Sequence, residues 1–424
     1  MPASAQVPFG ALRNRNFRFF ISGQLISLSG TWMQNVALGW LVLTLTDSAF
    51  AVGLVGALSA LPVLLFTLQA GALATRINRL HAITLLQALM LLQAATLAYL
   101  AWTGRATLGW IIGLALVSGT LSAFEIPVRH TLLMDLVGRD NLMNAIALNS
   151  TAFNISRVVG PALAGVLTAA FGAALCFTVN AASYLAVLAG LLMIRPDPAF
   201  VVARRTAPPL SDAVAYVTAP GWPRTLVSLT AVYTVFAVAF LTVLPVYARD
   251  VLGTGPAGYG WLISAFGMGA AGGALALAGL GVGFRRGEVA LRAGLVMGSG
   301  LALLALVPSL ALASLALAAS GAAMAINAIT TNTLLQIESP EALRGRVIGV
   351  YSFIVVGLAP LGSLQAGWVG ERLGIRPGAA IGAAVCLAAT AWSLRRVAVA
   401  GLPPSERRQP AGHPWYRWKE RRRG

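Results

Sequence analysis

Long apolar runs, separated by short polar or charged stretches, follow one another along almost the whole chain. Most of these runs exceed the roughly 20 apolar residues that an α-helix needs to cross the hydrocarbon of a bilayer. Transmembrane β-strands show short segments of alternating polarity instead, so the continuous runs exclude a β-barrel. The pattern predicts twelve membrane-spanning helices, at residues 17–45, 48–75, 80–103, 107–135, 141–169, 173–194, 224–248, 257–281, 288–307, 309–336, 343–370 and 375–397.

The composition supports a membrane protein. Of the 424 residues, 58% are hydrophobic and only 10% are charged, whereas a soluble globular chain carries about 25% charged residues. So few charges cannot cover a surface that faces water. We therefore expect an all-α protein whose solvent is lipid.

The net charge of +17 is distributed unevenly. If the N-terminus is cytoplasmic, nearly all Lys and Arg residues fall on the inner side. Arg105, Arg249, Arg372 and Arg376 lie outside, and Arg157 lies within a span. This asymmetry follows the positive-inside rule, so we expect both termini in the cytoplasm and interpret the basic charge as a topology signal. Nucleic acid is not an expected partner.

The pattern breaks between the sixth and seventh runs. Residues 195–223 are rich in Pro and Arg and predict a cytoplasmic linker with a short amphipathic helix near 211–218. The linker separates an N-terminal six-helix bundle (1–194) from a C-terminal one (224–397). Residues 398–424 form a basic, aromatic tail, which we expect to lie on the anionic inner leaflet.

The two halves contain similar segments. "HTLLMDL" (130–136) resembles "NTLLQIE" (332–338) at an offset of 202, and "VVGPALAG" (158–165) resembles "VVGLAPLG" (355–362). Both pairs fall at corresponding places in the two halves. They predict a parallel six-helix repeat, which places a substrate site near the bilayer midplane between the halves.

Four segments carry a family resemblance: "FEIPVRHTLLMDLV", "LMNAIALNSTAFNISRVVGPALAG", "PVYARDVLG" and "NTLLQIESPEALRGRVIGVYSF". With them, the chain resembles major facilitator superfamily transporters over essentially its full length. More narrowly, it resembles the bacterial branch of enterobactin exporters and macrolide-efflux permeases. The resemblance implies two pseudo-symmetric bundles that work by alternating access in the bacterial cytoplasmic (inner) membrane.

One polar stripe runs along the fourth predicted span. Ser118, Ser122, Glu125 and Arg129 are spaced 4, 3 and 4 residues apart and therefore share one helix face. Glu125 is the only carboxylate well inside a span. An ionisable group at that depth costs about 2.5–3.5 kcal/mol and normally faces a cavity or a partner. The stripe fits either an internal ion pair with Arg129 or a protonation or substrate-cation site at Glu125.

Arg157 lies about 24 Å along the fifth span at 1.5 Å per residue, close to the midplane. Arginine keeps its charge there and must find acceptors. Glu125 is expected at a comparable depth on the fourth span. We therefore predict a contact between Arg157 and Glu125, direct or through water, which either loosens during transport or positions the helices permanently.

The same segment contains Gly160, Pro161 and Gly165. Pro161 removes a backbone hydrogen bond and clashes with the carbonyl of Arg157, and the glycines permit close helix approach. We expect a bend pressed against another helix. The segment partly resembles the antiporter signature of the superfamily, which favours export, although an ordinary packing helix would show the same residues.

The segment "GALATRINRL" (71–80) resembles the cytoplasmic loop motif of the superfamily, with Gly71 and Arg76 in place. Thr75 stands where the motif has an acid. We predict a cytoplasmic gate in which Arg76 pairs with Asp135, although simple positive-inside charge is an equal alternative. The repeat predicts a second pair, of Glu338 with Arg285 or Arg286.

Further polar and aromatic residues are candidates for the wall of a substrate cavity, although such residues also serve as helix–helix hydrogen bonds. The candidates are Gln24, Thr31, Trp32, Asn35, Ser118, Ser122, Asn327 and Thr331.

The sequence offers no support for a catalytic or metal centre. Cys176 and Cys386 lie in opposite halves, the three histidines are scattered, and no GxxxxGK[ST] loop for ATP is present. We expect no cofactor and no enzymatic activity. The predicted function is secondary active export of a hydrophobic or amphiphilic small molecule, of drug or siderophore type, by a monomer that uses the proton gradient. A same-fold importer, a lysophospholipid flippase and an inactive sensor or scaffold are the alternatives.

Overall fold

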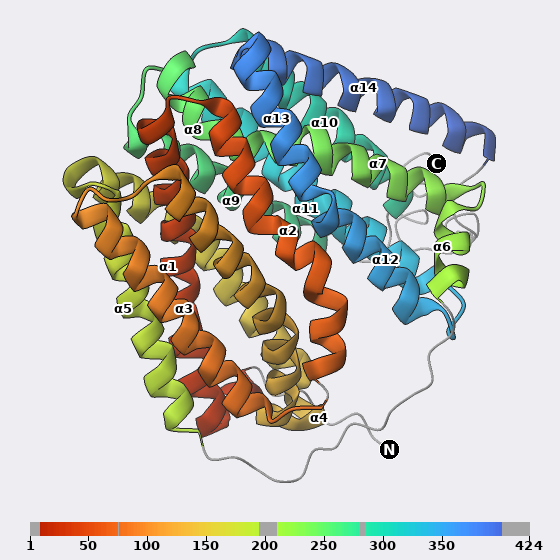
Figure 1. The fold of residues 1–424 in the computed structure, drawn as a ribbon. Helices are drawn as coiled ribbons and strands as arrows, with labels where there is room; N and C mark the ends of the chain where they lie inside the picture. Colours follow the sequence, from red (N-terminus) through yellow and green to blue (C-terminus); the bar gives the residue numbers. More distant parts are fainter. Residues whose placement is uncertain (1–8, 75, 195–209, 280–284, 401–424) are drawn as a thin grey trace, which may run out of the picture.

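The computed structural model describes residues 9–74, 76–194, 210–279 and 285–400, and every regular element within them is a helix (Figure 1). Thr75, where the loop motif lacks its acid, lies outside the described residues. So do 195–209 of the predicted linker and all but the first three residues of the predicted tail.

The helices fall into two groups. The N-terminal group consists of α1 (Arg15–Thr46), α2 (Ala49–Ala74), α3 (Arg79–Trp102), α4 (Leu108–Phe171) and α5 (Ala173–Leu192). The C-terminal group consists of α7 (Trp222–Phe236), η2 (Val238–Val243), α8 (Leu244–Val246), η3 (Tyr247–Val251), α9 (Pro256–Gly279), α10 (Arg286–Leu306), α11 (Leu310–Glu338), α12 (Arg344–Gly357), α13 (Ala359–Leu373) and α14 (Ile375–Ala400). Between the groups, α6 (Leu210–Thr218) forms where the linker helix is predicted.

Eleven helical segments among the described residues are long and apolar enough to cross a membrane. The first predicted span, α1, is a 32-residue helix that runs beside α4 and α5 (Figure 1). Its side chains Gln24, Gln34 and Asn35 lower its hydropathy, so composition alone does not mark it as a span. With α1 included, the described part of the chain holds twelve membrane-length segments.

The long element α4 contains the predicted fourth and fifth spans. Gly138 has a positive φ of 69° and a ψ of 178°, a conformation that glycine adopts without a side-chain clash. The chain therefore turns at Gly138 and divides into spans 108–138 and 141–171. The second of these stays helical through Pro161.

Two predicted spans are interrupted rather than continuous. The seventh passes from α7 through the 3₁₀-helix η2 and the short α8 into the π-helical turn η3. The eleventh is broken at Leu358 between α12 and α13. Pro360 causes the second break, because it has no amide hydrogen and its ring clashes with the carbonyl of Val356.

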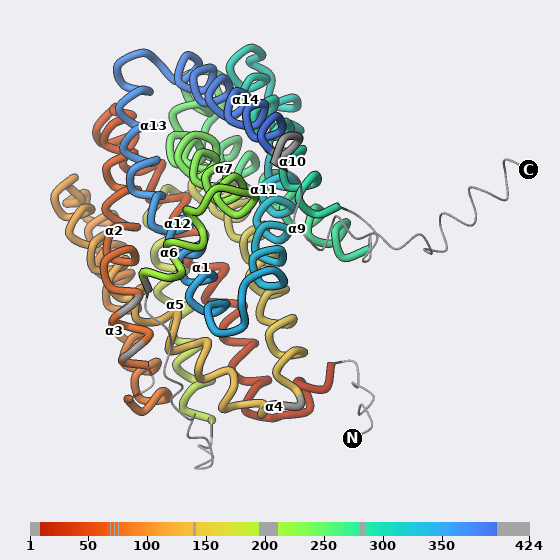
Figure 2. The backbone as a smooth tube through the Cα atoms, turned by 90° about the vertical axis from the view of Figure 1, so that its right-hand side faces the viewer, coloured from red at the N-terminus to blue at the C-terminus, as the bar shows by residue number. Residues whose placement is uncertain are grey.

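Two pairs of helices make the most extensive contacts between the groups. One pair is α2 with α13, and the other is the second span of α4 with α9 (Figures 1 and 2). In the first crossing, a Cβ on Gly367 would lie 2.9 Å from the Cα of Gly53. In the second, a Cβ on Gly165 would lie 3.1 Å from the Cα of Gly260. Glycines thus let the backbones approach closely in both crossings.

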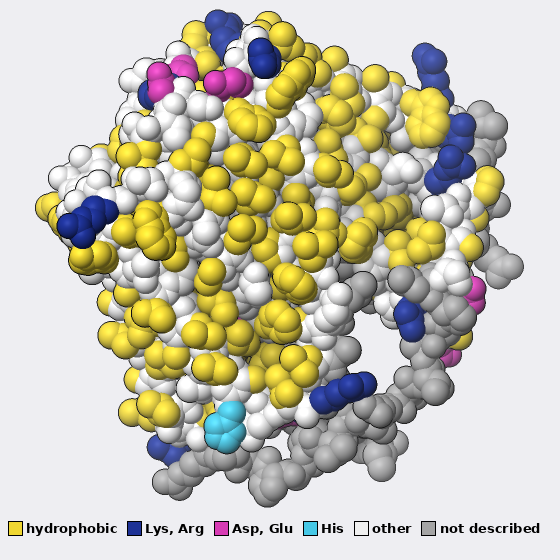
Figure 3. Space-filling model, viewed as in Figure 1, with side chains coloured by type: hydrophobic (Ala, Val, Ile, Leu, Met, Phe, Trp, Pro, Cys, Tyr) yellow, Lys and Arg dark blue, Asp and Glu magenta, His cyan; other side chains and the backbone are white. Residues whose placement is uncertain are grey.

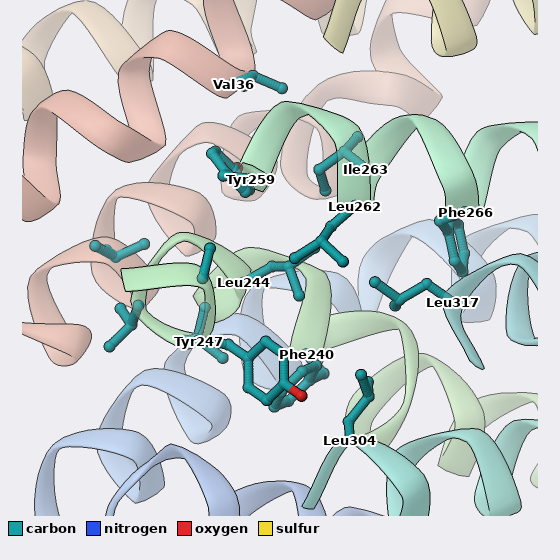
Figure 4. Packing of buried hydrophobic residues seen from close by; sticks show 14 of the residues in the cluster. Val36, Phe240, Leu244, Tyr247, Tyr259, Leu262, Ile263, Phe266, Leu304 and Leu317 are labelled. Atoms are coloured by element: carbon teal, nitrogen blue, oxygen red, sulfur yellow. The ribbon is translucent and has the colours of Figure 1, made fainter. Parts of the chain in front are cut away.

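The apolar core is shared at one end of the molecule and divided at the other. One large cluster takes residues from both groups, such as Val36 on α1 and Tyr259 and Leu262 on α9 (Figure 4). At the opposite end each group has its own cluster, one around Phe17 in the N-terminal group and one around Val347 in the C-terminal group. We name the divided end cytoplasmic, because the basic residues of the helix ends concentrate there.

The outer surface fits a bilayer. Apolar side chains cover the middle of the face shown in Figure 3, and most of its charged side chains lie towards the ends of the helices. Large apolar residues such as Leu92, Leu275 and Leu306 are 64–74% exposed. This distribution is that of a surface covered by lipid.

Candidate functional site

Glu125 lies inside the N-terminal group, only 6% exposed. Its Oε1 is 3.0 Å from Nε of Arg129, one turn further along α4, and 3.5 Å from the amide nitrogen of Gln87 on α3. Arg129 is itself only 8% exposed. The structure thus contains the predicted internal ion pair and adds Gln87, which the sequence analysis did not identify. Of the predicted stripe, Ser118 and Ser122 are half-buried.

The predicted direct contact between Arg157 and Glu125 is absent, and a contact through water stays a prediction. The guanidinium of Arg157 donates to Oδ1 of Asn154 at 3.0 Å and lies 5.9 Å from the ring centre of Phe153. Glu125 instead faces Arg129 and Gln87. Sequence spacing estimates the height of a side chain along its helix but not the rotation of the helix, so it could not assign the partners of these two residues.

The segment around Pro161 is pressed between two helices. A Cβ on Gly160 would meet α1, at 2.6 Å from Cβ of Trp32, and Gly165 faces α9. The hydroxyl of Ser264 on α9 donates to the carbonyl of Val158 at 2.8 Å. This hydrogen bond joins the two groups next to the carbonyl of Arg157 that Pro161 leaves free.

At the cytoplasmic end, Asp135 has a different partner from the predicted one. Arg79 donates to both carboxylate oxygens of Asp135 at 2.6 Å, whereas Arg76 is exposed in the turn before α3. Asn78 caps the N-terminus of α3 by accepting from the amide of His81. The cap directs the first helical residue, Arg79, towards the end of the fourth span. Both members of this pair belong to the N-terminal group.

The residues of the second predicted pair, Arg285 and Glu338, each have another contact. Arg285 donates to Oε1 of Glu288 at 2.8 Å, within α10 and its cap. The backbone carbonyl of Glu338 accepts from the hydroxyl of Tyr216 on α6, which ties the linker helix to α11. The pairing of Glu338 with Arg285 or Arg286 stays a prediction, as does the gating role of half-buried Gly71.

The predicted cavity residues of α1 have different environments. Asn35 is exposed, Trp32 packs edge-on against Phe153, and the hydroxyl of Thr31 lies 3.2 Å from that of Tyr184 on α5. Gln24 is only 3% exposed. Asn35 is thus accessible and Thr31 and Trp32 are half-buried, whereas Gln24 lies within the helix packing.

Asn327 and Thr331 lie inside the C-terminal group, at the repeat positions of Glu125 and Arg129, since the same offset of 202 residues separates each pair. Asn327 is 3% exposed and Thr331 is fully buried. The amide of Asn327 donates to the carbonyl of Ala290 on α10, as Gln87 of α3 donates to Glu125. Both repeat positions thus contact the preceding helix of their group, but the residues are ionisable in the first group and neutral in the second.

The outer end holds a charged contact that the sequence analysis missed. Arg249 donates to Asp47 at 2.6 Å across the two groups. Glu371 on α13 accepts from the hydroxyl of Ser48 and the amide of Phe50 at the start of α2. Asp47, Arg249 and Glu371 line a pocket of about 430 Å³. The repeat offset was an available signal, because it also separates Asp47 from Arg249.

The described residues contain no group of three or more His, Cys, Asp or Glu side chains that could hold a metal ion. Cys176 and Cys386 are free and buried. The chemistry that the site supports is therefore that of a buried ion pair and of helix contacts between two groups.

The fold and this site define a multi-pass membrane transporter of the major facilitator superfamily. A bacterial homologue of the human lysosomal transporter Spinster, solved in an inward-facing conformation, matches with a TM-score of 0.71 over 93% of this chain and 99% of that one. Its sequence identity is 15%, so the likeness is one of fold. The transmembrane secretion effector family matches residues 6–418, and the chain belongs to that family.

The chain aligns with two relatives over most of its own length and most of theirs. The chain is 28% identical over 360 residues to the multidrug efflux pump Tap of Mycolicibacterium fortuitum, covering 82% of this chain and 87% of that protein. It is also 28% identical over 356 residues to the enterobactin exporter EntS of Shigella flexneri, covering 82% and 85%. These matches confirm the predicted superfamily and its transporter class, as opposed to an enzyme.

Proposed function

We propose that this protein is a secondary active exporter in the bacterial cytoplasmic membrane, where a monomer expels a hydrophobic or amphiphilic small molecule in exchange for protons. The similarity to Tap and EntS, a drug efflux pump and a siderophore exporter by name, supports export of such a molecule. No GxxxxGK[ST] loop is present in the sequence, so the energy comes from an ion gradient. One charge moving through 100 mV yields about 2.3 kcal/mol.

The observation that carries this proposal is the buried pair of Glu125 and Arg129. A carboxylate at this depth is costly and is usually functional. Protonation removes the negative charge that compensates Arg129 and turns one carboxylate oxygen into a donor, so it changes the interactions of α4 with α3. Because α4 also forms the crossing with α9, a change in its packing can reach the contact between the groups.

The proposed movement uses the two helix groups as rigid halves, residues 1–194 and 224–397. The outer end is held by the shared core and by Asp47 with Arg249, while the cytoplasmic cores are separate. This arrangement suits loading from the cytoplasm. We assign Asn35, Thr31 and Trp32 to the wall of the substrate cavity, because α1 exposes or half-exposes them.

Transport by inverted membrane vesicles tests the proposal. Vesicles with the protein are supplied with a panel of drugs and siderophores, with and without an uncoupler. We expect accumulation of at least one compound that the uncoupler abolishes. Accumulation that persists without a proton gradient, or movement only in the opposite direction, would contradict proton-driven export.

A further inference from the structure

Five buried polar residues of the N-terminal group lie one or two helical turns from members of the cytoplasmic apolar cluster: Gln24 on α1, Gln87 on α3, and Glu125, Arg129 and Asn149 on the two spans of α4. We call them the polar layer. Every member is 2–9% exposed. Each side chain must therefore find its hydrogen-bond partners within the protein or in bound solvent.

Members of two apolar clusters flank Gln87 and Glu125 along their helices. On α3, Ile83 belongs to the cytoplasmic cluster and Met90 to the next cluster inwards. On α4, Leu132 and Leu121 belong to the same two clusters. The polar-layer members of both helices lie between these residues.

Gln24 and Asn149 occupy a similar position relative to the cytoplasmic cluster. Each follows a member of the cytoplasmic cluster, Phe20 or Ala145, by four residues and so shares its helix face. The five residues are therefore buried beside the cytoplasmic apolar cluster of the N-terminal group.

Four buried atoms of the polar layer lack a hydrogen-bond partner, three acceptors and one donor. The amide oxygens of Gln24, Gln87 and Asn149 have no partner, and Nε of Arg129 makes no hydrogen bond of good geometry. An ionised Glu125 can only accept, so it cannot satisfy these oxygens. Each buried acceptor without a donor costs about 1–3 kcal/mol. The missing donors are water, or the hydroxyl of a protonated Glu125.

The repeat position in the C-terminal group provides the contrast. There Oδ1 of Asn327 accepts from Thr230 at 3.2 Å, and its amide nitrogen donates to Ala290. Both ends of that amide are satisfied by protein. The hydroxyl of Thr331, at the repeat position of Arg129, has no partner, so the contrast holds for Asn327 and Glu125 and not for the whole repeat pair.

We infer that the polar layer binds water inside the N-terminal group, and that Glu125 exchanges its proton with this water rather than with the interface between the groups. In this step a hydronium ion gives its proton to the carboxylate, which leaves water and a neutral acid. The acid hydroxyl then donates to the free oxygen of Gln87. The inference rests on the proposed proton-carrying role of Glu125.

Infrared spectroscopy of the full-length protein in lipid nanodiscs tests this without a substrate. The carbonyl band of protonated Glu125 is identified by its loss in Glu125→Gln, and its shift is followed after mixing with D₂O. We expect Gln87→Leu to slow this shift at least tenfold. Gln93→Leu is the control and leaves the rate within twofold, because Gln93 is buried on the same helix but binds Gln34 and the carbonyl of Leu114.

Equal rates in Gln87→Leu and the wild-type protein would overturn the inference, as would a wild-type band that exchanges as slowly as buried backbone amides. Absence of the band at every pH would also overturn it. If Gln87→Leu does not fold, Asn149→Leu is measured instead, with the same expected slowing. Rapid exchange of the band without proton-driven transport would contradict the proposed function alone, so the two failures are distinguishable.

Discussion

The side chains of Glu125 and Arg129 form a buried ion pair whose two members depend on each other. Removing one partner of such a pair leaves a charge without compensation in the bilayer interior, which costs about 3–5 kcal/mol. Asn327 and Thr331 show that the same fold position accepts a neutral pair. The repeat therefore supplies a natural template for neutralising the site.

We predict that Arg129→Thr lowers the thermal stability of the purified protein at neutral pH, because Glu125 loses its cation. The double variant Glu125→Asn/Arg129→Thr copies the C-terminal pair and should recover most of the lost stability. Thermal unfolding in detergent measures both. A double variant as unstable as the single one would show that the repeat position does not transfer.

The contacts of individual side chains were the hardest feature to predict from the sequence. It identified Glu125 as the buried acid, because a count of carboxylates along the spans suffices for that. It could not identify Gln87, since amides are common in spans and the contact depends on how α3 and α4 are rotated. The choice of Arg76 over Arg79 failed for a similar reason, because the cap at Asn78 decides which arginine reaches Asp135.

Between helices, the closest approach of the two groups is made by glycines. A Cβ on Gly260 would lie 2.4 Å from the carbonyl oxygen of Pro161 and 2.7 Å from the Cα of Gly165. On the same helix, a Cβ on Gly272 would meet nothing within 4 Å. The chain therefore offers a matched pair of positions on α9.

We predict that Gly260→Ala separates α9 from α4 and reduces export at least tenfold, while Gly272→Ala keeps near wild-type export. Vesicle transport at equal protein levels measures the difference. Equal export by the two variants would mean that the α4–α9 crossing tolerates a wider spacing than the structure shows.

The outer contact between Asp47 and Arg249 offers a second test at this level. Both side chains are partly exposed, at 80% and 33% for the side-chain atoms, so the pair contributes about 0–1 kcal/mol. That contribution can bias the position of the halves by up to about fivefold. It cannot hold the outer end closed alone, which fits a gate that must open in each cycle.

We predict that Asp47→Asn increases labelling of a cysteine introduced at Ala49, a buried residue that lines the outer pocket. Asparagine tolerates the positive φ of 48° at this position, so the variant changes charge and not backbone. Asp250→Asn is the control, because Asp250 contacts Arg249 within the same group. The rate of labelling by a membrane-impermeant thiol reagent measures the change. An unchanged rate would exclude Asp47 as a gate residue.

For the molecule as a whole, the apolar runs predicted most of the architecture, because bilayer thickness sets the length of every span. The breaks at η2 and at Leu358 were not predicted. A run of apolar residues shows that a segment crosses the membrane but not whether its helix is continuous, and Pro161 in the fifth span causes no break where Pro360 does. Hydropathy also could not show that the cores join at only one end, since that depends on the relative position of the two groups.

The central claim is that Glu125 carries the proton that drives export. Its most direct test compares Glu125→Gln with the wild-type protein in proteoliposomes, using a compound that the vesicle panel identifies as cargo. We predict that the variant still exchanges labelled for unlabelled cargo within a few-fold of the wild-type rate, but loses all uptake driven by a pH gradient. Undiminished pH-driven uptake by Glu125→Gln would contradict the claim.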